Sequence, residues 1–421
     1  MIIGGGPAGA LAALAVTRHG GREVLVVDPA PRLGPGSAYA TAERGHLLNS
    51  RAGTMSADPA DPGDFAAWAR CRPDAFVPRG VFGAYLADRL GPVPHVARHA
   101  VRVRPAGPRG WAVELNDGTT RRASAVVLAV GPPPPVFPSA ASVGVRRASG
   151  YVPVPWSPGA LDHIAPRDRV LLLGTGLTAV DAVLTLLSRG HTGRIVAVSR
   201  HGLLPRAHAD APGPVPVATD AVPAGLRGLL CELRASADWR ASVDALRPRV
   251  DHVWAGLTLD EQRRFLRHLA RYWEVHRHRC APGVAAAIDQ ARAAGALVVG
   301  ATRVTAIHSR PRGFEVTFAD SGQQSFDAVV NCTGPGHAAG IPLVRTLVAD
   351  GLAKADPLGL GIDVDAAGRL VGRHGRPTEG LHVLGSLRRG RWWETTAIPE
   401  IRSQAHAVAV GLSAVPAHHA A

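Results

Sequence analysis

MIIGGGPAGALAALAV, residues 1–16, opens the chain and decides the first part of the fold. A short apolar segment leads into Gly4, Gly6 and Gly9 at G-x-G-x-x-G spacing, and the Ala/Leu-rich segment that follows predicts a helix. The first glycine of this pattern permits a tight turn, the second lets the backbone approach a pyrophosphate, and the third lets the helix pack against its strand. Phosphate would then lie against the free N–H groups at the helix N-terminus.

The same stretch argues against two other uses of an apolar N-terminus. No Lys or Arg precedes Arg18, so the basic leader of a secretion signal is missing. The apolar run ends at Thr17, short of the roughly 18 apolar residues that a membrane-spanning helix needs. Because Met1–Ile3 makes a very short first strand, we expect either a brief strand or a reading frame that begins upstream. A glycine-rich helix start without a ligand is the alternative.

An acidic residue follows the first fingerprint at a suitable distance. The apolar strand EVLVVD ends at Asp28, near the distance of about 20 residues expected for the carboxylate that binds ribose hydroxyls. A carboxylate at this position suits an unphosphorylated ribose such as that of FAD.

A second fingerprint lies in RVLLLGTGLTAVDAVLTLLSRGHTGRIVAVSRHGLLP, residues 169–205. Its strand, residues 170–173, runs into Gly174-x-Gly176-x-x-Ala179, and a further strand, residues 195–198, follows at βαβ spacing. That strand ends in Ser199-Arg200-His201 without an acid, and a guanidinium can bind a 2′-phosphate in bidentate fashion. The pattern favours NADPH over NADH, the alternative being an arginine that is merely exposed at a strand end.

A pattern that occurs twice in the sequence defines the expected domains. Residues 111–135 and 314–338 share one plan: two strands around a polar turn, then an apolar strand ending at a Gly-Pro bend. We expect the first copy to complete the FAD domain and the second to bring the chain back to it. The predicted fold is therefore α/β, with a discontinuous FAD-binding domain (1–155 and 310–421) and an NADPH-binding domain (156–309) that carries a helical insert at about 222–294.

Composition narrows the function classes. A chain of 421 residues suggests two or three domains. The net charge of +14 comes almost wholly from scattered arginines, with Lys354 the only lysine and 5% aromatic residues, so we expect no nucleic-acid partner. An anionic cofactor or a carboxylate-bearing substrate accounts for part of the charge.

Cysteine and histidine spacing argue against metal and disulfide chemistry. The four cysteines, Cys71, Cys231, Cys280 and Cys332, contain no C-x-x-C pair, which argues against a paired-cysteine disulfide reductase and a zinc site and favours a reduced, cytoplasmic setting. Thr258 and Glu261 form a capping box that predicts a helix start. His268, His276 and His278 follow it without a partnered carboxylate pattern, so we expect a solvated basic helix face and no metal site.

The chain resembles the bacterial FAD/NAD(P)-binding flavoproteins with two dinucleotide domains, which are related to flavin-dependent monooxygenases. Besides the fingerprints, the resemblance rests on residues 38–68, on FVPRGVFGAYL, on SRHGLLPRAH and on RGRWWETTAIPEIRSQA. Two motifs depart from the usual pattern: Ala129-Val130-Gly131 replaces Ala-Thr-Gly, and Gly385-Ser386 replaces Gly-Asp. The sequence also lacks the pattern typical of Baeyer–Villiger enzymes.

This resemblance implies a set of site residues. The loop with His46 and Asn49 is expected near the cofactor, and Thr395, Thr396 and the helix after Pro399 near the reduced flavin ring. Trp392, Trp393 and Glu394 are expected on the substrate side, the alternative being packing tryptophans and a surface ion pair between Glu394 and Arg391. The predicted catalytic residues are Asn49, Trp393 and Glu394. The predicted cofactor-binding residues are Gly4, Gly6, Pro7, Ala8, Gly9, Asp28, His46, Asn49, Gly131, Gly174, Gly176, Thr178, Ser199, Arg200, Gly334, Gly385, Ser386, Thr395 and Thr396.

The leading hypothesis is an NADPH-dependent, FAD-containing monooxygenase that hydroxylates a small molecule with molecular oxygen. N-hydroxylation of an amine or amino acid is the subtype to test first, so an amino- or carboxylate-bearing substrate is expected. Two alternatives stay open: an NADPH-linked flavin reductase or dehydrogenase without oxygen insertion, and a non-catalytic flavin-binding protein. The sequence leaves the substrate and the oligomeric state open.

Overall fold

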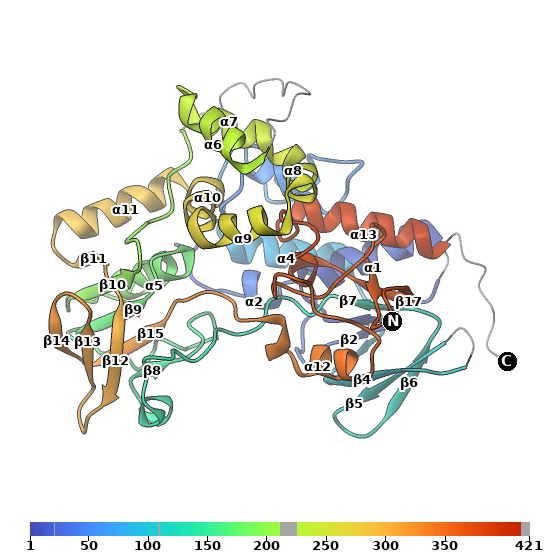
Figure 1. Cartoon of the computed structure of the whole chain (residues 1–421), viewed down its shortest axis with the longest axis horizontal. Coiled ribbons are helices and arrows are strands. Elements are labelled where there is room, and N and C mark those ends of the chain that lie inside the picture. Colours follow the sequence, from blue (N-terminus) through green and yellow to red (C-terminus); the bar gives the residue numbers. More distant parts are fainter. Residues whose placement is uncertain (21, 108–109, 211–224, 414–421) are drawn as a thin grey trace.

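Two α/β domains and a layer of helices make up the molecule. The computed structural model describes residues 1–20, 22–107, 110–210 and 225–413. In Figure 1 the first domain lies on the right, the second on the left, and the helical insert above them. The predicted fold class, with two Rossmann-like domains and a helical insert, is confirmed.

The first domain is built on a six-stranded sheet. Its strand order is β16-β17-β7-β1-β2-β3, parallel except for the β16/β17 pair. The strands are β1 (Ile2–Ile3), β2 (Val26–Val27), β3 (His95–Val96), β7 (Val126–Leu128), β16 (Arg369–Val371) and β17 (Pro377–Val383). The helices of this domain are α1 (Pro7–Gly20), α2 (Gly36–Tyr39), α3 (Asp64–Trp68), α4 (Arg79–Leu90), α12 (Pro342–Ala349) and α13 (Ile398–Ser413).

The first and last helices of the chain pack side by side (Figure 1). The Ala/Leu-rich face of α1, with Leu11 and Val16, meets Ile401, Ala405 and Val408 of α13 in one buried cluster. Small alanines let the two helices approach closely, and the apolar area they bury ties the C-terminal segment to the first glycine turn.

The second domain contains a five-stranded parallel sheet in the order β11-β10-β9-β15-β8. Its strands are β8 (Tyr151–Val152), β9 (Val170–Leu173), β10 (Ile195–Ser199), β11 (Leu297–Ala301) and β15 (Ala328–Asn331). Strands β9 and β15 are buried along their whole length because elements pack on both faces, as expected for continuous apolar runs in a parallel sheet. Helices α5 (Leu177–Ser188) and α11 (Pro282–Ala293) contribute to this core.

The two echoed segments form meanders, but the second one does not return the chain to the first domain. Strands β4 (Ala100–Pro105), β5 (Trp111–Leu115) and β6 (Thr120–Ala123) precede β7, which pairs with β1. Strands β12 (Val304–Ser309), β13 (Phe314–Phe318) and β14 (Gly322–Phe326) precede β15, which pairs with β9. Each meander therefore delivers the chain back to its own sheet.

Two of the expected domain boundaries are wrong for this reason. The sequence predicts residues 310–331 in the first domain, but β15 lies between β9 and β8 of the second sheet. It also predicts residues 151–152 in the first domain, yet β8 pairs with β15. The chain crosses back to the first domain only after β15, through residues 332–341.

The helical insert consists of α6 (Gly225–Ala235), α7 (Trp239–Leu246), α8 (Val250–Gly256), α9 (Leu259–His268) and α10 (Ala270–Arg277). The capping box predicted at Thr258 and Glu261 is confirmed at the start of α9. Residues 222–224 of the expected insert lie outside the described residues. In the part of the chain that the structure describes, five short 3-10 helices complete the fold: η1 (Ala52–Thr54), η2 (Val143–Arg147), η3 (Arg247–Arg249), η4 (Ala338–Gly340) and η5 (Gly385–Arg388). Within the described ranges, no helix has the length and apolar character needed to cross a bilayer.

Candidate active site

The two glycine turns are built in the same way in both domains. Gly4 follows β1 with φ +104°, and Gly174 follows β9 with φ +124°, both in the region that favours glycine. A Cβ on Gly4 would clash with the carbonyl oxygen of Ala129 after β7, and a Cβ on Gly174 with that of Cys332 after β15. The first glycine of each motif is therefore required by the close approach of its own central strands.

The remaining motif positions differ between the turns. A Cβ on Gly9 would strike the carbonyl of Gly4, so the third position of the first motif needs glycine, whereas Ala179 is buried without conflict in the second. Gly176 faces open space, as a position reserved for a pyrophosphate requires. Gly6 approaches Gly36, and Pro7 and Ala8 begin α1, whose first-turn N–H groups have no partner within the helix.

Asp28 is held at the end of β2 by two backbone donors. Its Oδ2 accepts the N–H of Gly5 at 2.6 Å, and its Oδ1 accepts the N–H of Ala30 at 2.7 Å. A carboxylate has about four acceptor sites, so two bonds leave capacity for ribose hydroxyls. Asp28 thus fixes the glycine turn itself, and the ribose contact stays a prediction.

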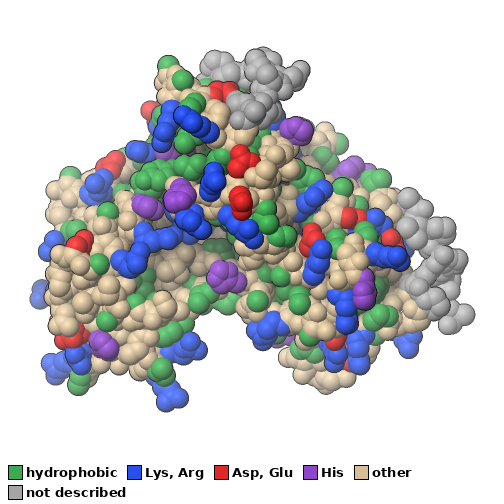
Figure 2. Space-filling view, viewed as in Figure 1, with side chains coloured by type: hydrophobic (Ala, Val, Ile, Leu, Met, Phe, Trp, Pro, Cys, Tyr) green, Lys and Arg blue, Asp and Glu red, His purple; other side chains and the backbone are tan. Residues whose placement is uncertain are grey.

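A cleft of about 710 Å³ lies where the two domains and the insert meet. The cleft brings together eight of the predicted residues, namely Gly174, Gly176, Thr178, Ser199, Arg200, Gly334, Ser386 and Trp393. Figure 2 shows Lys or Arg and His side chains around a hollow on this face. Among the lining residues, Arg200, Arg271 and Arg389 stand against the single carboxylate of Glu274. The excess of positive charge suits a phosphate-bearing ligand.

Sequence reasoning missed the wall that α10 contributes to this cleft. Glu274 pairs with Arg271 at 2.5 Å and with Arg389 at 3.2 Å, and the Arg389 guanidinium lies 4.2 Å from the ring centroid of Trp393. Burial lowers the pKa of His278 to about 4, so this side chain is neutral at pH 7. His278 is partly exposed and lines the cleft instead of the solvated outer face that the sequence predicts; its i, i+3, i+7 spacing with Arg271 and Glu274 was the available signal.

The loop after β17 holds several buried polar atoms without a protein partner. Within the described residues, Ser386 Oγ, Arg388 Nε, Arg389 Nε and Trp392 Nε1 make no hydrogen bond. Buried polar groups are normally satisfied, so such a cluster at the end of a strand of the first sheet fits a ligand with polar atoms. Ser386 and Arg389 also line the cleft, which makes them the best placed of the four.

Other predicted groups of this region are already engaged. The Gly385 N–H donates to Gln404 Oε1 at 2.9 Å, and Gln404 Nε2 donates to Thr395 Oγ1 at 2.8 Å. Thr395 in turn donates to the Gly385 carbonyl at 3.1 Å and is fully buried, whereas Thr396 is exposed. Gln404 therefore fixes the loop against α13, which begins at Ile398 with Pro399 in its first turn. Gly131 and Gly334 adopt φ +70° and +85° at the two crossings between domains.

The neighbouring side chains of Trp393 and Glu394 point to different places: Trp393 lines the cleft, and Glu394 contacts the helical insert. Trp393 lines the cleft and packs against Trp254 and Phe265 at centroid distances of 4.8 and 5.0 Å. Glu394 is 6% exposed and pairs with Arg277 at 3.0 Å, not with Arg391. Its backbone N–H also donates to Asp251 at 3.0 Å. Glu394 therefore anchors the C-terminal loop to the insert instead of facing the cleft.

His46 and Asn49 connect the domains. His46 Nε2 lies 2.8 Å from Thr185 Oγ1 on α5, and the carbonyl of Asn49 accepts a hydrogen bond from His208 Nε2 at 3.0 Å. Arg79 forms an ion pair with Asp181, and Glu43 with Arg189 at 2.8 Å. We call the three pairs His46–Thr185, Arg79–Asp181 and Glu43–Arg189 the interdomain latch. Asn49 lines neither the cleft nor the cavity described next.

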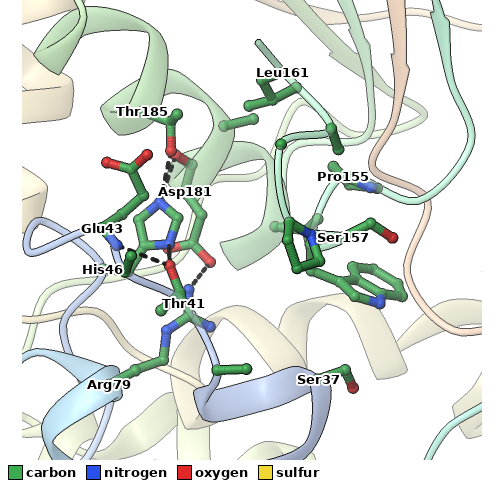
Figure 3. Close-up of a pocket in the computed structure, with 18 of the residues that line it drawn as sticks. Ser37, Thr41, Glu43, His46, Arg79, Pro155, Ser157, Leu161, Asp181 and Thr185 are labelled. Carbon is green, nitrogen blue, oxygen red and sulfur yellow. Dashed lines mark hydrogen bonds and ion pairs between the residues drawn. The ribbon is translucent and has the colours of Figure 1, made fainter. Parts of the chain in front are cut away.

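A second cavity of about 410 Å³ lies beside the latch. Figure 3 shows His46, Asp181 and Arg79 on one side of it and Pro155, Ser157 and Leu161 on the other. Pro132, Thr178 and Pro335 line both this cavity and the cleft. The two spaces are therefore neighbours with these three residues between them, and we call the three residues the neck.

Known proteins share the sequence pattern of the first domain and the fold of the whole chain. Residues 1–133 match the family described as FAD-NAD(P)-binding. No curated protein matches the sequence.

Solved structures match over nearly the full length. The cadaverine monooxygenase of desferrioxamine biosynthesis from Erwinia amylovora, bound to FAD, has 14% identity and a TM-score of 0.70 over 100% of this chain and 96% of that chain. The ornithine N-hydroxylase from Kutzneria sp. 744, with reduced FAD, NADP⁺ and L-ornithine, has 15% identity and a TM-score of 0.66 over 98% and 97%. Bacillithiol disulfide reductase from Bacillus cereus has 15% identity and a TM-score of 0.59 over 98% of both chains. The chain thus matches the FAD-NAD(P)-binding family over its first 133 residues and has the two-domain fold that these flavin monooxygenases and disulfide reductases share.

Proposed function

We propose that the protein binds FAD in the first domain and NADPH in the second and acts as a monooxygenase that hydroxylates a small molecule at amino nitrogen. The observation that carries the proposal is the single cleft, which joins the Gly174 turn and Arg200 of the second domain to Ser386 and Trp393 at the edge of the first. A nicotinamide and a flavin can therefore meet in the described arrangement of the domains.

The residues present fit FAD in the first domain. The Gly4 turn and the α1 N-terminus would hold the pyrophosphate, Asp28 the ribose, and Ser386 with the other unpartnered polar atoms of its loop the ribityl chain and ring edge. FAD supplies hydride acceptance and oxygen activation when bound. The α13 N-terminus places positive dipole charge near the same loop and would stabilise negative charge there.

NADPH fits the second domain. The open space at Gly176 and the N-terminus of α5 would receive its pyrophosphate, and Arg200 its 2′-phosphate. Arg271 adds positive charge from the insert. Among the predicted catalytic residues, Trp393 would contact the reacting rings, whereas Asn49 and Glu394 act as positioning residues through the contacts described above.

The overall reaction balances without any group beyond those proposed. NADPH gives up a hydride and is oxidised to NADP⁺, the O–O bond of oxygen breaks, an N–O bond forms on the amine, and the second oxygen atom leaves as water with a proton from solvent. The E. amylovora and Kutzneria proteins, by their names, act on cadaverine and ornithine, which supports an amine substrate here.

Two observations favour this function over a disulfide reductase. None of the four cysteines is paired, and they lie on different elements, so no dithiol is available to carry electrons. The latch also ties the loop around His46 to α5, which favours a fixed arrangement of the domains. Unpaired cysteines further support a reducing, cytoplasmic setting, and the bacterial sources of the similar structures support a bacterial one.

The test is a stopped-flow experiment on the FAD-loaded protein. Anaerobic NADPH is expected to bleach the flavin absorbance, and oxygen with an amine is expected to give one hydroxylamine per NADPH. Direct return to oxidised flavin with no oxygenated product from any amine would support the reductase alternative. No bleaching by NADPH would exclude both functions and leave a non-catalytic flavin-binding protein.

A further inference from the structure

We infer that the second cavity is the chamber that binds the organic substrate, and that this substrate is an amine with a hydrocarbon body and no carboxylate. The inference rests on the proposed function, because it names the substrate of that reaction. It commits to one of the two substrate types that the sequence left open.

The neck puts the chamber beside two predicted cofactor-binding positions. Pro132 directly follows Gly131 at the first crossing between domains, and Pro335 directly follows Gly334 at the second. Thr178, the third neck residue, lies in the first turn of α5, close to the Gly174 turn. A molecule in the chamber would therefore lie across the neck from the cleft that NADPH would fill, beside the Gly174 turn.

The cleft and the chamber differ in the net charge of the side chains that line them. The cleft carries three arginines, Arg200, Arg271 and Arg389, against Glu274. The chamber carries two arginines, Arg79 and Arg189, against three carboxylates, Glu43, Asp162 and Asp181. The formal balance of these Arg and Asp/Glu side chains is thus +2 in the cleft (3 − 1) and −1 in the chamber (2 − 3).

The arginines of the chamber are also occupied. Arg79 pairs with Asp181, and Arg189 pairs with Glu43 at 2.8 Å and with Asp162 at 2.7 Å. An incoming carboxylate would have to displace one of these pairs and would add to the excess negative charge. A protonated amine meets no such conflict, and the exposed Asp162 at the chamber wall attracts it.

The uncharged wall is mostly hydrocarbon. Pro155, Trp156 and Leu161 line one side, and Ala38 and Ala40 are exposed into the other. A volume of about 410 Å³ lies in the range of small-molecule sites, and the indole of Trp156 offers a face for an aromatic or aliphatic group. The chamber therefore suits a compact apolar amine.

The experiment uses pairs of ligands that differ only in a carboxylate. Binding of 2-phenylethylamine and L-phenylalanine, and of cadaverine and L-lysine, is measured by calorimetry on the FAD-loaded protein. Each amine is expected to bind at least tenfold more tightly than its amino acid. Ala40→Trp, which adds an indole to the chamber wall, is expected to weaken amine binding at least tenfold while NADPH-driven flavin reduction stays within twofold. Ala293→Trp, an exposed change on α11 outside both spaces, is the control and is expected to change neither.

Each outcome decides a separate point. Equal or tighter binding of the amino acids, no binding of either amine, or an Ala40→Trp protein with unchanged amine binding would overturn the inference. Loss of flavin reduction in Ala40→Trp would overturn it too, because the chamber would then belong to the cofactor site. Amine binding that follows the expected pattern without hydroxylamine formation would keep the chamber assignment and refute the proposed function instead.

Discussion

Arg79 at the start of α4 in the first domain forms an ion pair with Asp181 on α5 of the second, and both side chains are about three-quarters buried, at 25% and 22% exposure. Removing one partner of such a pair leaves the other charge poorly solvated. Arg79→Ala is expected to lower the free energy of unfolding by about 1–3 kcal/mol and to slow flavin reduction by NADPH. Chemical denaturation and stopped-flow absorbance measure the two effects.

The matched control for this pair is Arg72–Asp74, in which Arg72 is 83% exposed. Arg72→Ala is expected to change stability by less than about 0.5 kcal/mol. If Arg79→Ala behaved like Arg72→Ala in both measurements, the latch would not hold the domains in register.

Substitutions in the two glycine turns are expected to abolish two different properties, NADPH-driven reduction and FAD binding. Gly174→Ala forces a Cβ toward the Cys332 carbonyl at φ +124°, so it is expected to abolish NADPH-driven reduction while FAD stays bound. Gly4→Ala is expected to lose FAD instead. Flavin content by absorbance and reduction kinetics distinguish them. Gly283→Ala, in open space on α11 without a positive φ, is the control and should change neither. An active, FAD-replete Gly174→Ala protein would contradict the assignment of the second turn.

Arg200 is expected to set the choice of nicotinamide cofactor. Arg200→Ala removes the guanidinium at the end of β10 and should raise the KM for NADPH by roughly 10- to 100-fold, with the KM for NADH nearly unchanged. Steady-state kinetics with both cofactors measure the ratio. An equal rise for both would mean that Arg200 supports the fold and does not bind a phosphate.

Replacing Ser386 is expected to have opposite effects on the FAD-free and the FAD-loaded protein. Its Oγ is buried without a partner, so Ser386→Ala is expected to leave the FAD-free protein equally or more stable. In the FAD-loaded protein the same change should weaken FAD binding by about 1 kcal/mol or more, roughly fivefold. Thermal unfolding with and without FAD, together with a flavin titration, checks both. Unchanged FAD affinity would remove Ser386 from the flavin site.

Two histidines with lowered pKa values are expected to make the folded protein less stable in acid. Burial lowers the pKa values of His208 and His278 to about 4 in the folded state, against an ordinary value near 6.5. The unfolded chain therefore binds more protons between these values, and stability should fall as the pH drops from about 6.5 toward 4, by about 2 kcal/mol per histidine at pH 5. His208→Gln keeps an N–H donor for the Asn49 carbonyl and should flatten the decline seen in urea titrations. His374→Gln, at an exposed position, should leave the profile unchanged.

Local patterns predicted the glycine turns well because the constraint there is local. Gly4, Gly9 and Gly174 each sit where a side chain would strike nearby backbone, and the spacing alone indicates this. The capping box of α9 is equally local. By contrast, local sequence does not determine which sheet the strand after the second meander joins. Strands β7 and β15 read alike, and both β1 and β9 offer a parallel apolar edge, so only the packed structure decides which pairs form.

Long-range partners explain the other differences. Glu394 pairs with Arg277, which is 117 residues away in sequence, and Trp393 joins a cluster with Trp254 of the insert. His46 and Asn49 bond to the second domain across similar separations. No spacing rule connects such positions, since they meet only when the insert folds over the seam between the domains.

Pro132 and Pro335 lack an N–H and have a fixed φ, so the neck between the cleft and the chamber resists widening. A nucleotide in the cleft and an amine in the chamber would each enter and leave without passing through the neck. Neither would have to wait for the other, so the order of binding would be random, and spent NADP⁺ could stay bound while the hydroxylated product departs.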